Sequence, residues 1–260
     1  MTKPERMMAK LMSRRSERAL GRLTVAGLAV GALLSLVVAP PDAVQGEVQR
    51  LMYIHVPSAW LACQAFFVVF VGSIAYLKTK NRRWDDLAVA SAELGVLFTV
   101  LTIVLGSLWA RPTWGTWWTW DPRLTTTSIL LMIYVSYLGV RRMAANQDRA
   151  RKWAAVLGIV GFVDVPIIHL SVVWWRTIHQ QATVIRPDGP TMAPVMLWTL
   201  LTAFAACMLL YSYLLVLRMR VGRLEAQIVT QGVAARVVSG DRIANQLGSI
   251  VTDPATQGRA

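Results

Sequence analysis

The sequence predicts an all-α integral membrane protein with six transmembrane helices. Hydrophobic residues make up 55% of its 260 residues, and they gather in long blocks. A helix needs ~20 residues to cross a bilayer core about 30 Å thick, and the blocks have about that length. They are continuously apolar, without the alternation of a membrane β-barrel. The predicted spans are residues 23–39, 56–77, 87–109, 124–140, 153–174 and 194–217.

The distribution of basic residues predicts that both termini lie in the cytoplasm. The net charge of +13 is typical of nucleic-acid-binding proteins too, but 22 of the 27 Lys and Arg residues lie in the two tails and in the loops after spans two and four. Loops rich in Lys and Arg stay on the cytoplasmic side, so the charge indicates topology and we expect no nucleic-acid partner. We expect a basic cytoplasmic tail at 1–22, a membrane domain at 23–217 and a second cytoplasmic tail at 218–260.

The first span also has features of a secretory signal peptide. A basic segment precedes it, and it ends at Val38-Ala39-Pro40-Pro41. Proline directly after the candidate cleavage site disfavours cleavage. Removal of the span would also place the termini on opposite sides, which conflicts with the basic C-terminal tail. We therefore expect the first span to be retained.

Several polar residues and both cysteines fall inside spans. Glu93 in span three and Asp164 in span five are costly in lipid, so a proton path and a neutral, packed acid are both open. We expect His169 in span five to be buried and hydrogen-bonded to its neighbours. Cys63 and Cys207 form no Cys-x-x-Cys unit, which argues against thiol redox chemistry and against a zinc site.

The segment between spans three and four is rich in tryptophan. Nine of the 11 tryptophans in the chain are expected on the outer side, whereas an aromatic belt at lipid headgroups would populate both interfaces. If the segment forms a surface helix, rings three and four residues apart share one face and form a platform for a large planar ligand. Four of these tryptophans fall within seven residues: Trp114, Trp117, Trp118 and Trp120.

Span four begins with a strong helix-start signal. Asp121 is a favourable N-cap residue, and Pro122 suits the first helical position. Capping alone would justify this aspartate, and it does not exclude a second role in positioning the tryptophan-rich segment.

Two histidines are expected at the same outer depth as the tryptophans. His55 precedes Pro57 at the outer end of span two, and His179 follows span five. Two neutral imidazoles on different helices could bind one haem iron from opposite faces, and guanidinium groups bind carboxylates such as the haem propionates. Composition alone leaves a quinone or a lipid headgroup as alternative ligands. The arginines at this level are Arg50, Arg111, Arg123 and Arg176.

The run from Trp114 to Thr125 resembles the WWD signature of membrane haem-handling proteins, and most closely that of the Heme exporter protein C family (CcmC) of cytochrome c maturation. The similarity covers about residues 45–217 and the same six-span plan. Larger members of the superfamily typically have Lys-Glu after Asp-Pro, where this chain has Arg123-Leu124-Thr125. Other matching segments are Tyr53-Ile-His-Val-Pro57, Gly106-Ser-x-Trp-Ala110, Pro166-Ile-Ile-His169 and Trp174-Trp-x-Thr-x-His-Gln180.

The resemblance implies a haem carrier of the bacterial inner membrane and not an enzyme. His55 and His179 match the axial ligands of the haem iron. The tryptophan loop matches the surface that presents haem b, bound non-covalently as cargo, to the periplasmic haem chaperone (CcmE). The family works beside an ABC ATPase (CcmA), its membrane subunit (CcmB) and a small single-span subunit (CcmD), and this sequence has no Walker A motif of its own. The other predicted haem-binding residues are Trp114, Trp117, Trp118, Trp120, Asp121 and Arg123.

Two other functions remain open from the residues alone. A quinol-oxidising haem protein would usually need a second haem, for which the sequence offers at most one spare histidine, His169. A solute permease would use the tryptophans to gate a pathway, but the sequence has no internal repeat of the inverted-repeat type.

Overall fold

The computed structural model describes residues 14–144, 146–180, 183–184 and 186–252, and over these residues it is helical with irregular connections and no strand. Most of the predicted N-terminal tail therefore lies outside the described residues. In chain order the helices are α2 (Arg14–Leu33), η1 (Leu34–Val38), η2 (Glu47–Leu51), α3 (Met52–Thr79), α4 (Arg82–Trp114), α5 (Pro122–Met143), α6 (Gln147–Gly161), α7 (Asp164–Trp174) and α8 (Pro194–Thr252).

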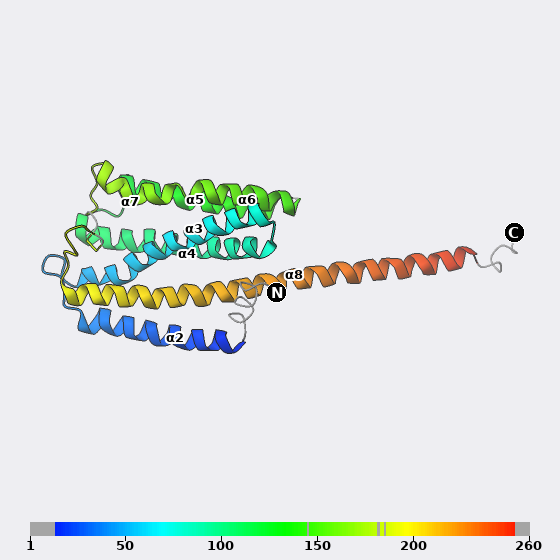
Figure 1. Cartoon of the computed structure of the whole chain (residues 1–260), viewed down its shortest axis with the longest axis horizontal. Helices are drawn as coiled ribbons and strands as arrows, with labels where there is room; N and C mark the ends of the chain where they lie inside the picture. The colour runs from blue at the N-terminus through cyan, green and yellow to red at the C-terminus, as the bar shows by residue number, and fades with distance from the viewer. Residues whose placement is uncertain (1–13, 145, 181–182, 185, 253–260) are drawn as a thin grey trace. The chain divides into compact units, whose positions relative to one another are not determined.

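The chain packs as two units, Met1–Leu217 and Arg218–Ala260. The first unit holds the helices that lie side by side in Figure 1, including the first part of α8. The second unit holds the rest of α8, which continues as helix to Thr252 beyond the predicted end of span six.

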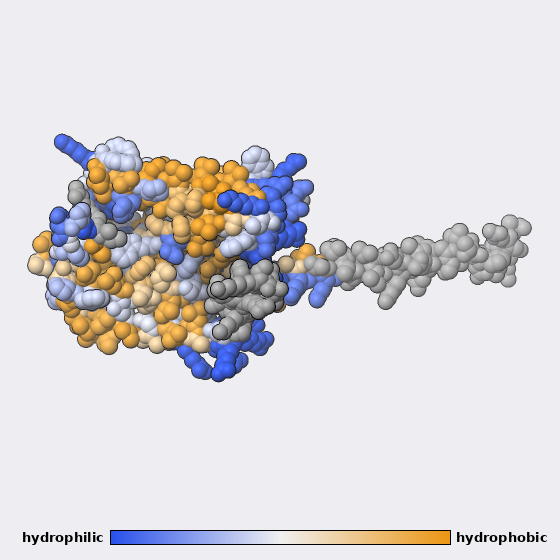
Figure 2. All heavy atoms as spheres, in the orientation of Figure 1, coloured by the Kyte–Doolittle hydropathy of each residue, from blue (hydrophilic) through white to orange (hydrophobic). Residues whose placement is uncertain are grey.

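All six predicted spans are present as helices long and apolar enough to cross a membrane, which confirms the predicted fold class. Each helix is longer than the apolar block that predicted it, because polar residues continue the helical backbone past the apolar part. Figure 2 shows a hydrophobic flank between more hydrophilic ends. The spans are Arg14–Val38, Glu47–Thr79, Arg82–Trp114, Pro122–Met143, Gln147–Trp174 and Pro194–Val229.

The fifth span is broken between α6 and α7, at Phe162 and Val163. Pro166 has no N–H to donate to the carbonyl of Phe162, and its ring would clash with that carbonyl in a continuous helix. The carbonyl of Phe162 instead accepts the N–H of Val165 at 3.1 Å. The chain therefore starts a new helix, α7, directly after the break.

The polar residues predicted inside spans lie in different surroundings. Asp164 is buried at the start of α7, and its Oδ2 atom has no hydrogen-bond partner in the described part of the chain. Glu93 is half-buried in α4. His169 is exposed, so the expectation of a buried histidine is wrong. A helix turns about 100° per residue, so the buried residues Asp164 and Ser171 share one face of α7 and His169 points away from it.

Helix α3 forms much of the core of the first unit, because it packs against both α4 and α6. The Phe66 ring stacks on Tyr134 of α5, with ring centroids 3.7 Å apart. A Cβ atom on Gly95 would lie 2.5 Å from the Phe66 ring, so this glycine lets α3 and α4 approach closely. The Ser91 hydroxyl is hydrogen-bonded to the Ala65 carbonyl and, at 2.7 Å, to the Tyr211 hydroxyl.

One buried carboxylate joins three helices at the end of the bundle where α4 begins. Asp85 receives two parallel hydrogen bonds from Arg141 at the end of α5, at 2.5 and 2.7 Å. Its Oδ2 atom also lies 3.2 Å from Nε of Arg151 in α6. Bidentate hydrogen bonding by a guanidinium fixes the orientation of the carboxylate as well as balancing its charge. We call this group of three residues the Asp85 clamp.

The opposite end of the first unit, which we call the tryptophan end, consists of residues 39–51, 115–121 and the described part of 175–193. Trp109 of α4 donates its Nε1–H to the Gln45 side chain at 2.8 Å. Arg50 donates to the carbonyl of Ala39 at 2.9 Å. The first bond holds the segment before α3 against the end of α4, and the second closes that segment on itself.

Candidate functional site

The structure brings His55 and His179 to the tryptophan end, although they lie far apart in the sequence. His55 is in the first turn of α3, and His179 is in the connection between α7 and α8. Both rings pack against residues of the last turns of α4. Both histidines therefore contact the same end of α4.

The His55 ring lies in a space left by a glycine. A Cβ atom on Gly106 would lie 2.9 Å from Cε1 of His55, so any larger residue would displace the ring. The edge of Trp109 meets the ring at a centroid distance of 5.7 Å and an angle of 76°. The Nδ1 atom of His55 is buried without a well-formed hydrogen bond among the described residues, and the acceptor beside the ring is the backbone carbonyl of Thr102.

The His179 ring is held by a carboxylate. Its Nδ1 atom lies 3.1 Å from Oδ1 of Asp121. Trp114, the last residue of α4, meets the ring edge-on at a centroid distance of 4.9 Å. The backbone N–H of His179 donates to the Thr177 hydroxyl at 3.1 Å.

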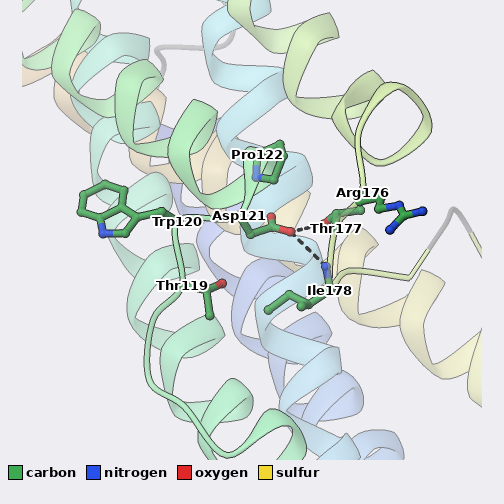
Figure 3. A pocket seen from close by; sticks show the side chains of 7 residues that line it. All are labelled: Thr119, Trp120, Asp121, Pro122, Arg176, Thr177 and Ile178. Atoms are coloured by element: carbon green, nitrogen blue, oxygen red, sulfur yellow. Dashed lines mark hydrogen bonds between the residues drawn. The ribbon is translucent and has the colours of Figure 1, made fainter.

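Asp121 has two structural roles. It caps α5, as predicted, because Oδ1 accepts the backbone N–H of Arg123 at 2.9 Å. Its Oδ2 accepts the Thr177 hydroxyl and, at 3.0 Å, the N–H of Ile178 (Figure 3). This carboxylate therefore fixes the segment that carries His179 to the first turn of α5.

The charges around Asp121 set the state of the His179 ring. Burial raises the pKa of the Asp121 carboxyl, but the hydrogen bond from Thr177, the nearby His179 and backbone N–H groups outweigh it and hold the pKa below its usual range. Burial lowers the pKa of His179; the charge of Asp121 opposes this shift and that of Arg123 adds to it. At neutral pH an ionised carboxylate therefore faces a neutral imidazole. Because the carboxylate can only accept, Nδ1 carries the proton and the lone pair is on Nε2.

The tryptophan segment does not form the surface helix that would place its rings on one face. Of its four tryptophans only Trp114 is helical, because Gly115 ends α4 in the left-handed conformation at φ 77°. The chain is irregular from Gly115 to Asp121. The rings of Trp118 and Trp120 meet edge-on at 5.7 Å. Trp120 is 79% exposed, the largest exposed fraction among the four predicted tryptophans for which the structure gives a value. The cluster is therefore a set of separate rings and not one helical face.

An open pocket of about 500 Å³ adjoins Asp121. In Figure 3 the Trp120 side chain and the Arg176 side chain lie on opposite sides of Asp121. The pocket thus combines an aromatic surface, a buried carboxylate and a cation at its rim. Its lining residues are Thr119, Trp120, Asp121, Pro122, Arg176, Thr177 and Ile178.

The four candidate arginines divide into two pairs. Arg50 and Arg111 donate to backbone carbonyls, the latter to Gly115 at 2.5 Å. Arg123 is half-buried beside Asp121, and its charge is close enough to His179 to lower the pKa of that imidazole. The Nε atom of Arg123 is buried with no hydrogen-bond partner among the described residues, and Arg176 is exposed at the pocket. Arg123 and Arg176 are therefore better placed than the first pair to bind an anionic group.

Sequence reasoning did not single out Gly106, Trp109, Thr177 or Gln45 as site residues. The first three lie within the segments that carry the family resemblance, so the signal was present without an assigned role. Gln45 became visible only through its hydrogen bond to Trp109.

The family model and the similar proteins point to the same family. The family model described as Heme exporter protein C (CcmC) matches residues 1–234. The chain is 40% identical over 201 residues to Heme exporter protein C of Bradyrhizobium diazoefficiens, covering 77% of this chain and 76% of the relative. It is 35% identical over 203 residues to Heme exporter protein C of Haemophilus influenzae, covering 78% and 82%. A putative cytochrome c biosynthesis ccmC-like mitochondrial protein of Arabidopsis thaliana is 37% identical over 192 residues, covering 74% and 72%. The chain therefore belongs to the Heme exporter protein C family.

Proposed function

We propose that this protein binds haem b non-covalently at the tryptophan end and presents it to the haem chaperone of cytochrome c maturation (CcmE). His55 and His179 bind the iron from opposite faces. The observation that carries the proposal is the pair of histidines held edge-on by Trp109 and Trp114, two residues near the end of the same helix. The name of the relatives, Heme exporter protein C, supports haem as the substrate.

The surroundings of the histidines suit a haem. Neutral imidazole is a good iron ligand, and Nε2 of His179 has its lone pair available because Asp121 accepts from Nδ1. Tryptophan rings supply flat apolar surfaces for a porphyrin. Arg123 and Arg176 supply guanidinium groups for the propionates. Trp117, Trp118 and Trp120 complete the presenting surface.

The membrane orientation follows from the basic residues. The positive-inside rule places the Asp85 clamp on the cytoplasmic side of the bacterial inner membrane and the tryptophan end on the periplasmic side. The protein acts as a carrier within an ABC-type complex. ATP hydrolysis belongs to a separate subunit (CcmA), which works with the membrane subunit (CcmB) and the small single-span subunit (CcmD).

The ligand assignment is tested by purifying the protein after haem-supplemented expression. We expect a six-coordinate haem spectrum that is lost in His55→Ala and in His179→Ala. His169→Ala is the matched control, because this third histidine is exposed on α7, and it should leave the spectrum unchanged. An unchanged Soret band in both single variants at positions 55 and 179 would overturn the assignment.

The presenting role is tested by co-purification with the chaperone in the presence and absence of haem. We expect capture only when haem is bound. Equal capture without haem contradicts presentation. Reduction of the bound haem by quinol indicates an electron-transfer protein instead.

A further inference from the structure

We infer that the two histidines act in sequence: His179 is the fixed ligand of the haem iron, and His55 is the ligand that leaves first. This inference rests on the proposed function, since it requires both histidines to bind the iron. The observation behind it is a difference in support. The Asp121 carboxylate is hydrogen-bonded to the His179 imidazole, while the described residues offer the His55 imidazole only the neutral backbone carbonyl of Thr102.

The support of His179 is chemical as well as geometric. A carboxylate that accepts Nδ1–H from a ligating histidine raises the basicity of the ligand and fixes the orientation of its ring. Asp121 is only 7% exposed, and it accepts hydrogen bonds from the Arg123 N–H, the Ile178 N–H and the Thr177 hydroxyl. The iron–nitrogen bond to His179 is thereby strengthened.

His55 lacks this support. If its Nε2 binds the iron, its Nδ1 carries a proton, and the acceptor that the described residues offer to this ring is the neutral backbone carbonyl of Thr102, without a well-formed hydrogen bond to Nδ1. The ring is otherwise restrained by close packing against Gly106 and by the edge of Trp109. A neutral carbonyl supports a ligating imidazole less strongly than a carboxylate does, so the bond between the iron and His55 is the weaker of the two.

The position of His179 in a connecting segment argues in the opposite direction, since connections are usually more mobile than helices. Hydrogen bonds outweigh this effect. Asp121 binds the Thr177 hydroxyl, the Ile178 N–H and the His179 ring, and it also caps α5. The short segment 177–179 is thus fastened to a helix end at three successive residues.

The inferred step is a ligand exchange. The bond between the iron and His55 breaks, and a bond forms between the iron and an incoming donor atom on the same face. The iron keeps its oxidation state, and the bond to His179 remains. An incoming ligand therefore reaches the haem from the His55 side.

Carbon monoxide is a suitable probe of this exchange in the dithionite-reduced, haem-loaded full-length protein. It takes the place of the weaker ligand, and photolysis then leaves a five-coordinate iron bound to the retained histidine. Resonance Raman spectroscopy gives the iron–histidine stretching frequency, which rises when a carboxylate accepts from the ligand. We expect a high frequency in the unmodified protein and a lower one in Asp121→Asn. An unchanged frequency in Asp121→Asn, with haem content retained, would mean that His55 is the retained ligand and would overturn the inference.

The choice of asparagine preserves the helix start, because Asn and Asp cap helices about equally well. The oxygen that accepts the Arg123 N–H is also the one that faces Nδ1 of His179, and as part of a neutral amide it accepts from that N–H more weakly than the carboxylate does. Asp188→Asn is the matched control, because Asp188 is an exposed aspartate in the same connection, and it should leave the frequency unchanged.

A second variant tests the inference without altering Asp121. In His55→Gly the retained ligand is unchanged, so the five-coordinate photoproduct should show the same stretching frequency as the unmodified protein. A changed frequency there contradicts the inference. The proposed function fails by a different result, namely a six-coordinate spectrum that survives in both His55→Ala and His179→Ala.

Discussion

Trp109 and Trp114 lie five residues apart near the end of α4, and each meets a different histidine edge-on, with ring centroids 5.7 Å from His55 and 4.9 Å from His179. One rigid helix therefore sets the spacing of two imidazoles that come from α3 and from a connecting segment. Both tryptophans lie on α4 itself, before the irregular segment that follows Gly115.

Gly106→Ala should weaken haem binding. The new methyl group would lie 2.9 Å from Cε1 of His55, and overpacking of this kind costs about 1–3 kcal/mol. Haem titration should show a weaker affinity and a five-coordinate fraction. Gly139→Ala in α5 is the control, because no atom lies within 4 Å of the added group. Equal affinity in both variants would show that Gly106 does not set the position of His55.

Loss of the Gln45 side chain should weaken haem binding to a smaller extent. Gln45→Leu removes the acceptor of the Trp109 Nε1–H, and a hydrogen bond contributes about 1 kcal/mol, so we expect an affinity about fivefold lower. Gln45→Glu keeps an acceptor oxygen and should restore binding. If leucine and glutamate behave alike in the titration, the hydrogen bond does not position Trp109.

Trp120→Ala should separate haem binding from presentation. Trp120 is 79% exposed, and its described ring contact is with Trp118 and with neither histidine. We expect an unchanged six-coordinate spectrum but weaker haem-dependent capture of the chaperone, by about 2 kcal/mol if Trp120 is an interface anchor. Trp114→Ala, beside His179, should instead alter the spectrum. Unchanged capture by the Trp120 variant would remove this ring from the interface.

The Asp85 clamp should dominate stability at the end of the bundle where α4 begins. Asp85→Asn leaves Arg141 and Arg151 without their buried carboxylate, and loss of one partner of a buried ion pair costs about 3 kcal/mol. Thermal unfolding in detergent should show a clear fall in Tm. Asp148→Asn is the control, because the Asp148 side chain is 70% exposed and an exposed pair contributes below about 1 kcal/mol. A similar Tm for both variants would show that Asp85 contributes no more to stability than Asp148 does.

Length and continuous apolarity were enough to predict the six spans, because a helix is the only structure that such blocks form in lipid. The same criterion could not place the break at Phe162 and Val163, since the apolar block runs through it without interruption. Pro166 was the signal, but a proline alone does not say whether a helix bends or starts again. The exposure of His169 also depends on the face that α7 presents to its neighbours, and no single helix encodes that.

Within the site, Asp121 illustrates what the sequence could and could not give. The Asp-Pro pair predicted the cap of α5, which the structure confirms. Its bonds to Thr177, Ile178 and His179 cross between segments more than 50 residues apart, and no local pattern records them. The tryptophan segment forms no surface helix because Gly115 ends α4 directly after Trp114, before the other three tryptophans.

The Asp85 clamp also determines how the site can widen. Asp85 and Trp114 lie at the two ends of α4, while Arg141 and Asp121 lie at the two ends of α5. With one pair of ends tied together, the helices separate at the other by turning about a pivot. At 1.5 Å per residue, α4 from Asp85 to Trp114 is about 44 Å long and α5 from Arg141 to Asp121 about 30 Å, so a turn of about 2° moves the far ends by about 1.5 and about 1.0 Å. A flat ligand can thus enter between the far ends of α4 and α5 after a small tilt of these helices, with little repacking of the core between them.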